Sequence, residues 1–367
     1  MTTVLFAGGG TGGHLMPALA IADAMVRRDP TIKPFFVGSH RGVEANVLPQ
    51  RPWPYELLPL EPIRRRHWWK NATLPLSLVR VVRRVRALVR SEQPALVVGT
   101  GGYVAGPVVW TALRAGIPGI LQEQNAFPGI ATRSLAPRVR QVHLGFPEAR
   151  RHLRPGPRTE VLDTGNPIQP PPEPRPDRAQ ARTRLGLAPN RPTVLVVGGS
   201  QGALAVNRAV DAAIAELIWP VHVQLIWQTG AGTYDSFANR DDRTRILVRP
   251  FLDPVSDAYA AADLVVARAG AMTIAELCAW GLPAVLVPLP TAAAGHQLTN
   301  AKALATAEAC VLLEQRHLTP HVLSEMVLTL LNAPARMAGI AAAALVRAHT
   351  DAADVIAVHA LRALAGR

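Results

Sequence analysis

Cysteine is scarce in this chain, and the few present form no recognisable pattern. Only two cysteines occur in 367 residues, Cys278 and Cys310, and both lie inside apolar stretches. Such a pair makes neither a disulfide framework nor the ligand spacing of a zinc site. We therefore expect a protein of a reducing compartment such as the cytoplasm.

Long hydrophobic runs are missing as well. No apolar run approaches the roughly 18 residues that a membrane-spanning helix needs. The N-terminus enters a strand-like run without a basic stretch or a small-residue cleavage site, so we expect no signal peptide. Hydrophobic residues still make up 49% of the chain and charged residues 18%, which argues against disorder. The length suits two domains or one large domain.

Acidic residues are scarce in the first half only. The chain carries 39 Lys and Arg against 26 Asp and Glu, a net charge of +13. Residues 1–165 contain 22 basic and 10 acidic residues, whereas residues 166–367 contain 17 and 16. This uneven excess predicts an anionic partner for the first half, which would be nucleic acid, a membrane surface or a phosphorylated substrate.

Short β-branched runs alternate with helix-length amphipathic runs, which predicts an α/β protein with parallel sheets. A proline-rich connector, PPPEPRP at 170–176, follows Gly165-Asn166-Pro167 and separates two such series. We place the domain boundary there, with domains at 1–164 and 165–344. The Ala-rich tail predicts helix, and it either packs on its own domain or returns to the first. The expected strands are Thr3–Ala7, Pro34–Val37, Leu96–Gly99, Gly119–Gln122, Gln141–Leu144, Thr193–Gly198, Val221–Gln228, Arg245–Val248, Leu264–Ala267 and Ala284–Pro288.

Three glycine-rich loops each follow an expected strand and open a helix. They are Gly8–His14, Gly99–Tyr103 and Gly198–Ala203. Free N–H groups at a helix start bind anions, usually phosphate, so the three loops together predict a ligand crevice. Residues 8–13 also fit a dinucleotide-binding fingerprint. However, the next strand ends at 37–41 without a carboxylate for the ribose, which disfavours a dehydrogenase.

The segment Arg268–Glu276 follows another strand and begins a further helix. Its N-terminus suits a diphosphate, and Glu276 could accept two hydrogen bonds from a ribose diol. The simpler interpretation is that Glu276 complements the helix dipole. Beside this Gly-Ala helix start we favour the ligand role.

Seven segments in order resemble the MurG family, the N-acetylglucosamine (GlcNAc) transferases that complete the lipid-linked peptidoglycan precursor. The resemblance covers essentially the whole chain. It implies a GT-B fold: two Rossmann-like domains facing a cleft, with a C-terminal helix at about 345–367 crossing back to the N-terminal domain. The segments are GGGTGGH at 8–14, GTGGYVAGP at 99–107, EQN at 123–125, GNP at 165–167, GGSQGA at 198–203, RAGAMTIAE at 268–276 and HQLTNA at 296–301.

The resemblance implies an inverting hexosyltransferase of peptidoglycan synthesis, and hence of cell wall biogenesis, cell shape and division. The donor is UDP-GlcNAc, and the acceptor is the MurNAc 4-hydroxyl of lipid I, which becomes lipid II. We expect no cofactor, and no protein-held metal because no D-x-D pattern occurs. Cell-wall or division proteins are possible partners. The alternatives are a related enzyme acting on diacylglycerol, and a non-catalytic nucleotide- or nucleic-acid-binding protein.

The site residues that the resemblance implies fall in both domains. His14 is a candidate base, or alternatively a capping or hydroxyl-orienting histidine. Glu123 is the rival base, or alternatively a structural group that fixes Asn125. Two positions depart from the family: Gln169 replaces its usual Arg, for which Arg175 and Arg268 are candidate substitutes, and Gln122 stands where a His is frequent. The implied substrate-binding residues are Thr11, Gly12, Gly13, Asn125, Ser200, Leu252, Ala271, Met272, Thr273, Ile274, Ala275, Glu276 and Gln297.

Residues 62–91 contain nine basic residues and no acid. Leu78–Arg90 predicts a helix with one apolar face, which we expect to pack on the sheet, and one arginine-rich face. Membrane contact then falls to Trp68, Trp69, Leu74 and Leu76, with arginines meeting anionic headgroups. The alternatives are a solvated basic face and nucleic-acid binding, for which no motif is present. With a lipid-linked acceptor implied, we favour peripheral binding at the cytoplasmic face of the inner membrane.

Overall fold

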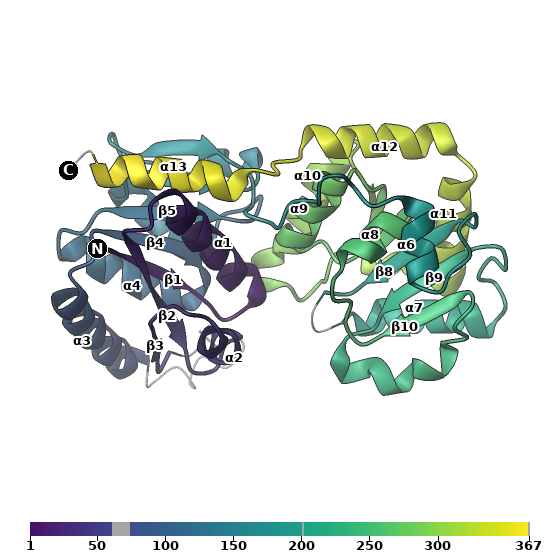
Figure 1. The fold of residues 1–367 in the computed structure, drawn as a ribbon, viewed down its shortest axis with the longest axis horizontal. Helices are drawn as coiled ribbons and strands as arrows, with labels where there is room; N and C mark the ends of the chain where they lie inside the picture. The colour runs from purple at the N-terminus through teal and green to yellow at the C-terminus, as the bar shows by residue number, and fades with distance from the viewer. Residues whose placement is uncertain (61–73, 200–201, 366–367) are drawn as a thin grey trace. The chain divides into compact units, whose positions relative to one another are not determined.

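The computed structural model describes residues 1–60, 74–199 and 202–365, with the backbone alone for 74–76. It divides into two compact units, the first comprising Met1–Ile168 with Asp351–Arg367 and the second Gln169–Thr350 (Figure 1). Among the described helices, none alone is long and apolar enough to cross a membrane, although α11 (Pro320–Leu331) and α12 (Pro334–Val346) together, bent by 91°, reach that length and composition.

The first unit is built on a parallel sheet of seven strands within the described residues, in the order β3-β2-β1-β4-β5-β6-β7. Its central strands are buried on both faces, which their β-branched and aromatic sequences favour. The strands are β1 Thr2–Gly8, β2 Ile32–Ser39, β3 Tyr55–Leu58, β4 Leu96–Gly101, β5 Gly119–Glu123, β6 Gln141–Leu144 and β7 Glu160–Asp163. The helices are α1 Gly12–Arg28, α2 Glu44–Val47, α3 Leu74–Glu92, α4 Gly102–Arg114, α5 Ile130–Leu135 and α13 Ala352–Ala365.

Two helical layers cover the two faces of this sheet. On one face α3, α4 and α5 bury their apolar sides, with Val81, Val85 and Val108 in the core. Leu78, which the sequence places on the packed side of α3, is instead 46% exposed. On the other face α13 lies along α1 and buries Ile356 and Ala360 with it, so the chain returns to the first unit as the resemblance predicts (Figure 1).

The second unit repeats the design with a parallel sheet of six strands among the described residues, in the order β10-β9-β8-β11-β12-β13. The strands are β8 Thr193–Val197, β9 Gln224–Gln228, β10 Ile246–Arg249, β11 Leu264–Ala267, β12 Ala284–Leu286 and β13 Val311–Leu312. The helices are α6 Arg178–Arg184, α7 Leu204–Ala215, α8 Ser256–Ala261, α9 Ala271–Trp280, α10 His296–Thr306, α11 Pro320–Leu331 and α12 Pro334–Val346. Both sheets therefore confirm the predicted fold class, two parallel α/β units of the GT-B type.

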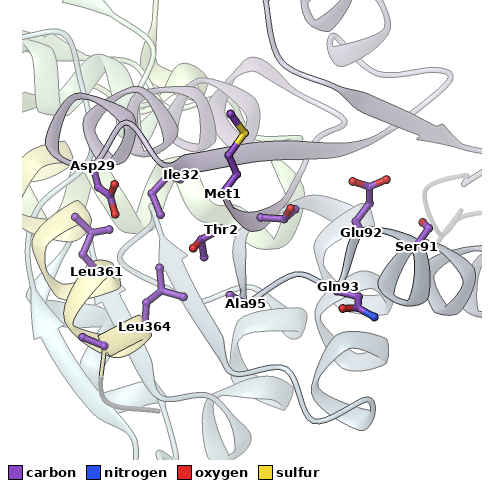
Figure 2. A pocket seen from close by; sticks show the side chains of 12 residues that line it. Met1, Thr2, Asp29, Ile32, Ser91, Glu92, Gln93, Ala95, Leu361 and Leu364 are labelled. Carbon is purple, nitrogen blue, oxygen red and sulfur yellow. The ribbon is translucent and has the colours of Figure 1, made fainter.

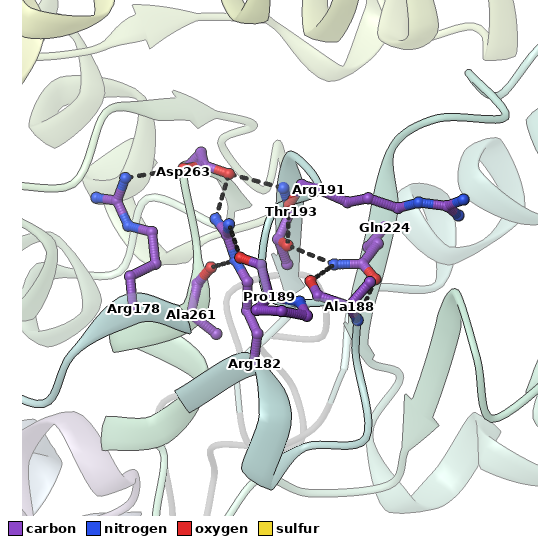
Figure 3. A network of polar contacts seen from close by, with 9 residues as sticks. All are labelled: Arg178, Arg182, Ala188, Pro189, Arg191, Thr193, Gln224, Ala261 and Asp263. Carbon is purple, nitrogen blue, oxygen red and sulfur yellow. Dashed lines mark hydrogen bonds and ion pairs between the residues drawn. The ribbon is translucent and has the colours of Figure 1, made fainter. Parts of the chain in front are cut away.

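A buried ion pair fixes α6 to the amino edge of the second sheet (Figure 3). Arg182, only 5% exposed, donates to Asp263 at 2.6 Å and to the backbone oxygens of Ala261 and Pro189. The same carboxylate accepts the backbone N–H of Thr193, the first residue of β8, at 2.7 Å. The network satisfies the buried guanidinium at the end of the sheet opposite to the glycine-rich loops.

Candidate active site

In the first unit, two glycine-rich loops meet where the strand order reverses. β1 and β4 are parallel neighbours, and α1 and α4 begin directly after them. Such a switch point leaves a crevice at the carboxyl ends of the strands, where ligands of α/β proteins bind. The two loops touch through their backbones: a Cβ on Gly102, whose φ is +76°, would lie 2.1 Å from the carbonyl oxygen of Gly9. Only glycine fits there.

Glu44 anchors the first of these loops, and the sequence alone did not identify it. Its fully buried carboxylate accepts the N–H of Gly10, with the two oxygens 3.0 and 2.9 Å away. It also accepts the backbone N–H and the hydroxyl of Ser39, each at 2.8 Å. A Cβ on Gly9, Gly38 or Gly42 would come within 2.4 Å of the Glu44 side chain. These flanking glycines are the signal that could have identified it.

Glu44 also bears on the dinucleotide-binding fingerprint at residues 8–13, which requires a carboxylate near the end of the second strand. The strand itself supplies no acid, but α2 places Glu44 beside its last residue, Ser39. Because the carboxylate is buried and occupied by the loop, it holds the backbone in place and does not face a ribose. Tyr103, from the second loop, completes the connection with a 2.7 Å hydrogen bond between its hydroxyl and that of Ser39.

His14 is the third residue of α1 and is half-buried. Its Nδ1 lies 2.9 Å from the hydroxyl of Thr11, the residue that precedes the helix. Its carbonyl oxygen accepts from Thr100 at 2.7 Å, and its Nε2 lies beside Gly101 of the second loop. The Thr11 hydroxyl makes no capping bond to the backbone. The imidazole is thus oriented by a side chain of its own loop.

Glu123 ends β5 and is 4% exposed. One carboxylate oxygen accepts the backbone and side-chain N–H groups of Asn125, at 3.1 and 3.3 Å. The other accepts the N–H of Gly129 at 2.9 Å and the hydroxyl of Thr132 at 2.6 Å. All four bonds hold the loop that carries Asn125, which favours the structural interpretation of Glu123.

Gln122, one of the departures from the family, belongs to a buried amide network. It donates to Asn166 at 3.0 Å, and Asn166 donates to the carbonyl oxygen of Gln124 at 3.0 Å. Gln124 in turn donates to the carbonyl oxygen of Thr100 at 2.7 Å and to the side chain of Gln122. The Gly-Asn-Pro segment is thereby connected to the second glycine-rich loop.

In the second unit, the loops after β8 and β11 flank the corresponding switch point. Ser200, an expected phosphate contact, lies outside the described residues. Two residues further along the chain, Gly202 has a φ of +76°, and a Cβ there would lie 2.0 Å from the carbonyl oxygen of Thr229. This loop therefore also requires glycine for a close backbone approach.

Gln228, at the end of β9, connects the glycine-rich loop Gly198–Ala203 to the expected donor contact Leu252, and the sequence alone did not identify it. Its amide nitrogen donates to the carbonyl oxygen of Gly199 at 3.1 Å. Its amide oxygen accepts the N–H of Leu252 at 3.1 Å. Because that N–H is occupied, the group that Leu252 can offer to a nucleobase is its carbonyl oxygen.

Helix α9 begins at Ala271, after Gly270, so residues 271–275 form its first turns. Glu276 lies beyond the first turn, which weakens its interpretation as a partner of the helix dipole. Its carboxylate accepts a 2.7 Å hydrogen bond from Tyr259, and burial raises the pKa of Glu276. On α10, Gln297 accepts the N–H of Leu289 at 2.9 Å, which directs its amide nitrogen elsewhere.

The two arginines considered as substitutes at Gln169 differ in position. Arg175 donates to the carbonyl oxygens of Ala279 and Trp280, at the C-terminal end of α9. Arg268 directly follows β11, is 7% exposed and donates to the carbonyl oxygen of Val287 at 3.1 Å. Burial lowers the pKa of Arg268. Only Arg268 stands at the end of α9 where a phosphate would bind.

One further feature lies apart from these loops. A hollow of about 740 Å³ opens at the amino edge of the first sheet, between Thr2, Glu92 and Leu364 (Figure 2). It is at the edge opposite to the glycine-rich loops. Within the described residues, no three His, Cys, Asp or Glu side chains are grouped so as to hold a metal ion.

Two doubly wound units with phosphate-type loops at both switch points define the GT-B class of fold. Residues 4–144 match the glycosyltransferase family 28 N-terminal domain, and residues 193–356 match the glycosyltransferase family 28 C-terminal domain. The chain therefore belongs to glycosyltransferase family 28.

Its relatives give a more specific comparison. The chain is 39% identical to a protein of Chlorobium phaeobacteroides over 364 residues, which cover 98% of each chain. It is 41% identical to a protein of Chlorobaculum tepidum over 360 residues, which cover 96% of this chain and 97% of the other. Both are named UDP-N-acetylglucosamine–N-acetylmuramyl-(pentapeptide) pyrophosphoryl-undecaprenol N-acetylglucosamine transferase. Among solved structures, MurG of Acinetobacter baumannii matches with a TM-score of 0.77 at 27% identity, covering 98% of this chain and 99% of the other. The resemblance to the MurG family is confirmed.

Proposed function

We propose that this enzyme transfers GlcNAc from UDP-GlcNAc to the MurNAc 4-hydroxyl of lipid I, forming lipid II of peptidoglycan synthesis. The observation that carries the proposal is the near full-length identity of 39% and 41% to two transferases named for this reaction. Transfer to diacylglycerol is not favoured, since none of the named relatives is a diacylglycerol transferase.

For the chemistry, we propose His14 as the base for the acceptor hydroxyl. With Nδ1 protonated and donating a hydrogen bond to the Thr11 hydroxyl, 2.9 Å away, Nε2 is the basic nitrogen of the ring and takes the proton of the attacking hydroxyl. Glu123 is the weaker candidate, because all four of its hydrogen bonds hold the Asn125 loop.

On the donor side we propose that the N-terminus of α9 and the loop containing Ser200 bind the diphosphate. Unpaired N–H groups of a helix start stabilise the charge that develops on a departing UDP. The first turn of α9 contains no acidic residue that would repel a phosphate. Arg268 adds a cation at this end of the helix, although Gln169 lacks the charge of the family arginine.

One assay tests the reaction. UDP release should be measured with UDP-GlcNAc and a lipid I analogue, and in parallel with UDP-glucose and diacylglycerol. We expect release only with the first pair. Absence of release with the lipid I analogue would refute the proposed reaction, and release with diacylglycerol would support the alternative.

We further propose that the first unit binds the anionic inner leaflet through the layer of α3, α4 and α5. The arginines of α3 project to solvent, which accounts for much of the positive charge of the first half. The same layer exposes large apolar side chains, and the guanidinium of Arg114 lies 5.7 Å from the ring of Trp110. These apolar residues are Leu78 at 46%, Val79 at 50%, Trp110 at 39% and Ile130 at 60% exposure. Trp68 and Trp69, predicted to contact lipid, lie outside the described residues, as do the side chains of Leu74 and Leu76.

Vesicle co-sedimentation tests this surface. Binding to phosphatidylcholine vesicles should rise severalfold when phosphatidylglycerol is added, because arginines meet anionic headgroups. Replacing Trp68 and Trp69 together, or Trp110, by alanine should weaken it. Val221→Asn, at a side chain that is 74% exposed in the second unit, is the matched control. Binding that ignores both lipid charge and these tryptophans would overturn the proposal.

A further inference from the structure

Tyr259 is a buried phenol whose hydroxyl is directed at Glu276. It lies on α8, is 4% exposed, and donates to one carboxylate oxygen of Glu276, Oε2, at 2.7 Å. Its ring also contacts Trp280 of α9, with centroids 5.8 Å apart. Burial and the neighbouring carboxylate raise the pKa of Tyr259 well above its ordinary value. The hydroxyl therefore stays protonated and acts as a donor.

This contact leaves the other oxygen of Glu276, Oε1, without a hydrogen bond to any described residue. No arginine or lysine of the described chain forms an ion pair with Glu276 either. A carboxylate removed from water is costly unless hydrogen bonds compensate it. The Tyr259 bond compensates Glu276 in part and also fixes the plane of the carboxylate. A carboxylate in one fixed orientation is what recognition of two adjacent hydroxyls requires.

We propose that Tyr259 is a positioning residue that orients Glu276 for the ribose diol of the uridine nucleotide. This inference rests on the proposed role of Glu276 in donor binding. Tyr259 does not itself touch the nucleotide: it holds Oε2, while Oε1 and the remaining lone pair of Oε2 face the diol. The pair gives the site its preference for a ribonucleotide over a nucleotide that lacks these hydroxyls.

The test compares two ligands on three variants by isothermal titration calorimetry. The ligands are UDP and 2′,3′-dideoxyuridine diphosphate, and the variants are Tyr259→Phe, Glu276→Gln and Tyr234→Phe. Tyr259→Phe keeps the ring that contacts Trp280 and removes only the hydroxyl. It should bind UDP roughly tenfold more weakly, the effect of losing one hydrogen bond to a charged group, and bind the dideoxy nucleotide like the wild type.

The other variants separate the possible failures. Tyr234→Phe removes a hydroxyl that bonds to no described residue of the same unit, so it should change neither affinity. Glu276→Gln should lose most of the preference for UDP. If it binds both ligands like the wild type, the donor role of Glu276 fails, and with it the positioning role.

Two results would overturn the inference alone. If Glu276→Gln loses UDP affinity but Tyr259→Phe does not, Tyr259 does not position the carboxylate. If Tyr259→Phe weakens both nucleotides equally, the hydroxyl serves the fold rather than the diol. Steady-state kinetics give a second measurement: the KM for UDP-GlcNAc should rise about tenfold in Tyr259→Phe with kcat nearly unchanged.

Discussion

Replacing Glu44 by alanine should loosen the first glycine-rich loop and reduce both stability and turnover. The substitution removes the acceptor of three donors: the N–H of Gly10, the N–H of Ser39 and the Ser39 hydroxyl. The hydroxyl keeps its contact with Tyr103, so two backbone N–H groups lose their partner. An unsatisfied buried donor costs about 1–3 kcal/mol. Water entering the vacated space offsets part of this, and we expect a loss of about 3 kcal/mol.

The loss should be visible in two assays. Urea unfolding should show a lower midpoint for the transition of the first unit, and hydrogen exchange by mass spectrometry should show faster exchange in the peptide that contains residues 8–14. Turnover should fall on the order of tenfold to a hundredfold, because His14 is carried by this loop.

Two variants serve as controls. Glu44→Gln should be milder than alanine, since an amide oxygen in place of Oε1 still accepts from Gly10 and from both donors of Ser39, and only the contact of Gly10 with Oε2 is replaced by an amide nitrogen that cannot accept. Glu92→Ala removes a glutamate of the same unit that makes a 3.5 Å surface ion pair with Lys33, and it should cost at most about 1 kcal/mol. Unchanged exchange and turnover in Glu44→Ala would refute the conclusion that the carboxylate holds the loop.

Three further predictions follow from other parts of the structure. Arg182→Met should lower the free energy of unfolding by about 3 kcal/mol in urea denaturation, because the buried carbonyl oxygens of Ala261 and Pro189 and the carboxylate of Asp263 each lose a hydrogen bond. Arg178→Met removes the second arginine partner of Asp263, at a side chain that is 56% exposed, and should change the free energy of unfolding by less than about 1 kcal/mol. UDP affinity should fall as the pH decreases, and the midpoint of this fall should lie above about 4.3, the ordinary pKa of glutamate. The reason is that burial raises the pKa of Glu276 and that only the ionised carboxylate accepts hydrogen bonds from two hydroxyls. A UDP affinity that stays unchanged down to pH 4 would contradict this prediction. His14→Ala should reduce kcat by about a hundredfold or more and leave the UDP affinity nearly unchanged; equal loss of both would assign His14 to binding rather than proton transfer.

The interior strands were predictable from the sequence, whereas of the four edge strands among the described residues only β10 was predicted. β6 and β11 begin and end at the predicted residues, and the other predicted strands agree within a few residues. Strands buried on both faces are mostly apolar, and such runs can be recognised in the sequence. The missed strands β3, β7 and β13 lie at sheet edges and are short and partly exposed, so neither their length nor their pattern distinguishes them from loops.

The site divides in the same way. The glycine-rich loops were predictable because their requirement is local: a strand end, a close backbone approach and a helix start occupy a few consecutive residues. The side chains that hold these loops come from elsewhere in the chain. Glu44 lies 34 residues from Gly10, Gln228 lies 29 residues from Gly199, and Tyr259 lies 17 residues from Glu276.

The sequence by itself determined the class of fold, the family and the positions of the phosphate-type loops, since each of these depends on patterns within short segments. Only the tertiary structure decided which side chains serve those loops. It assigned Glu123 four hydrogen bonds that fix the Asn125 loop, placed Arg175 at the far end of α9 from Arg268, and gave Glu276 its tyrosine partner. The physical reason is that hydrogen bonds join groups by distance in space, and the folding of the parallel sheets brings together residues whose separation along the chain carries no signal of their contact.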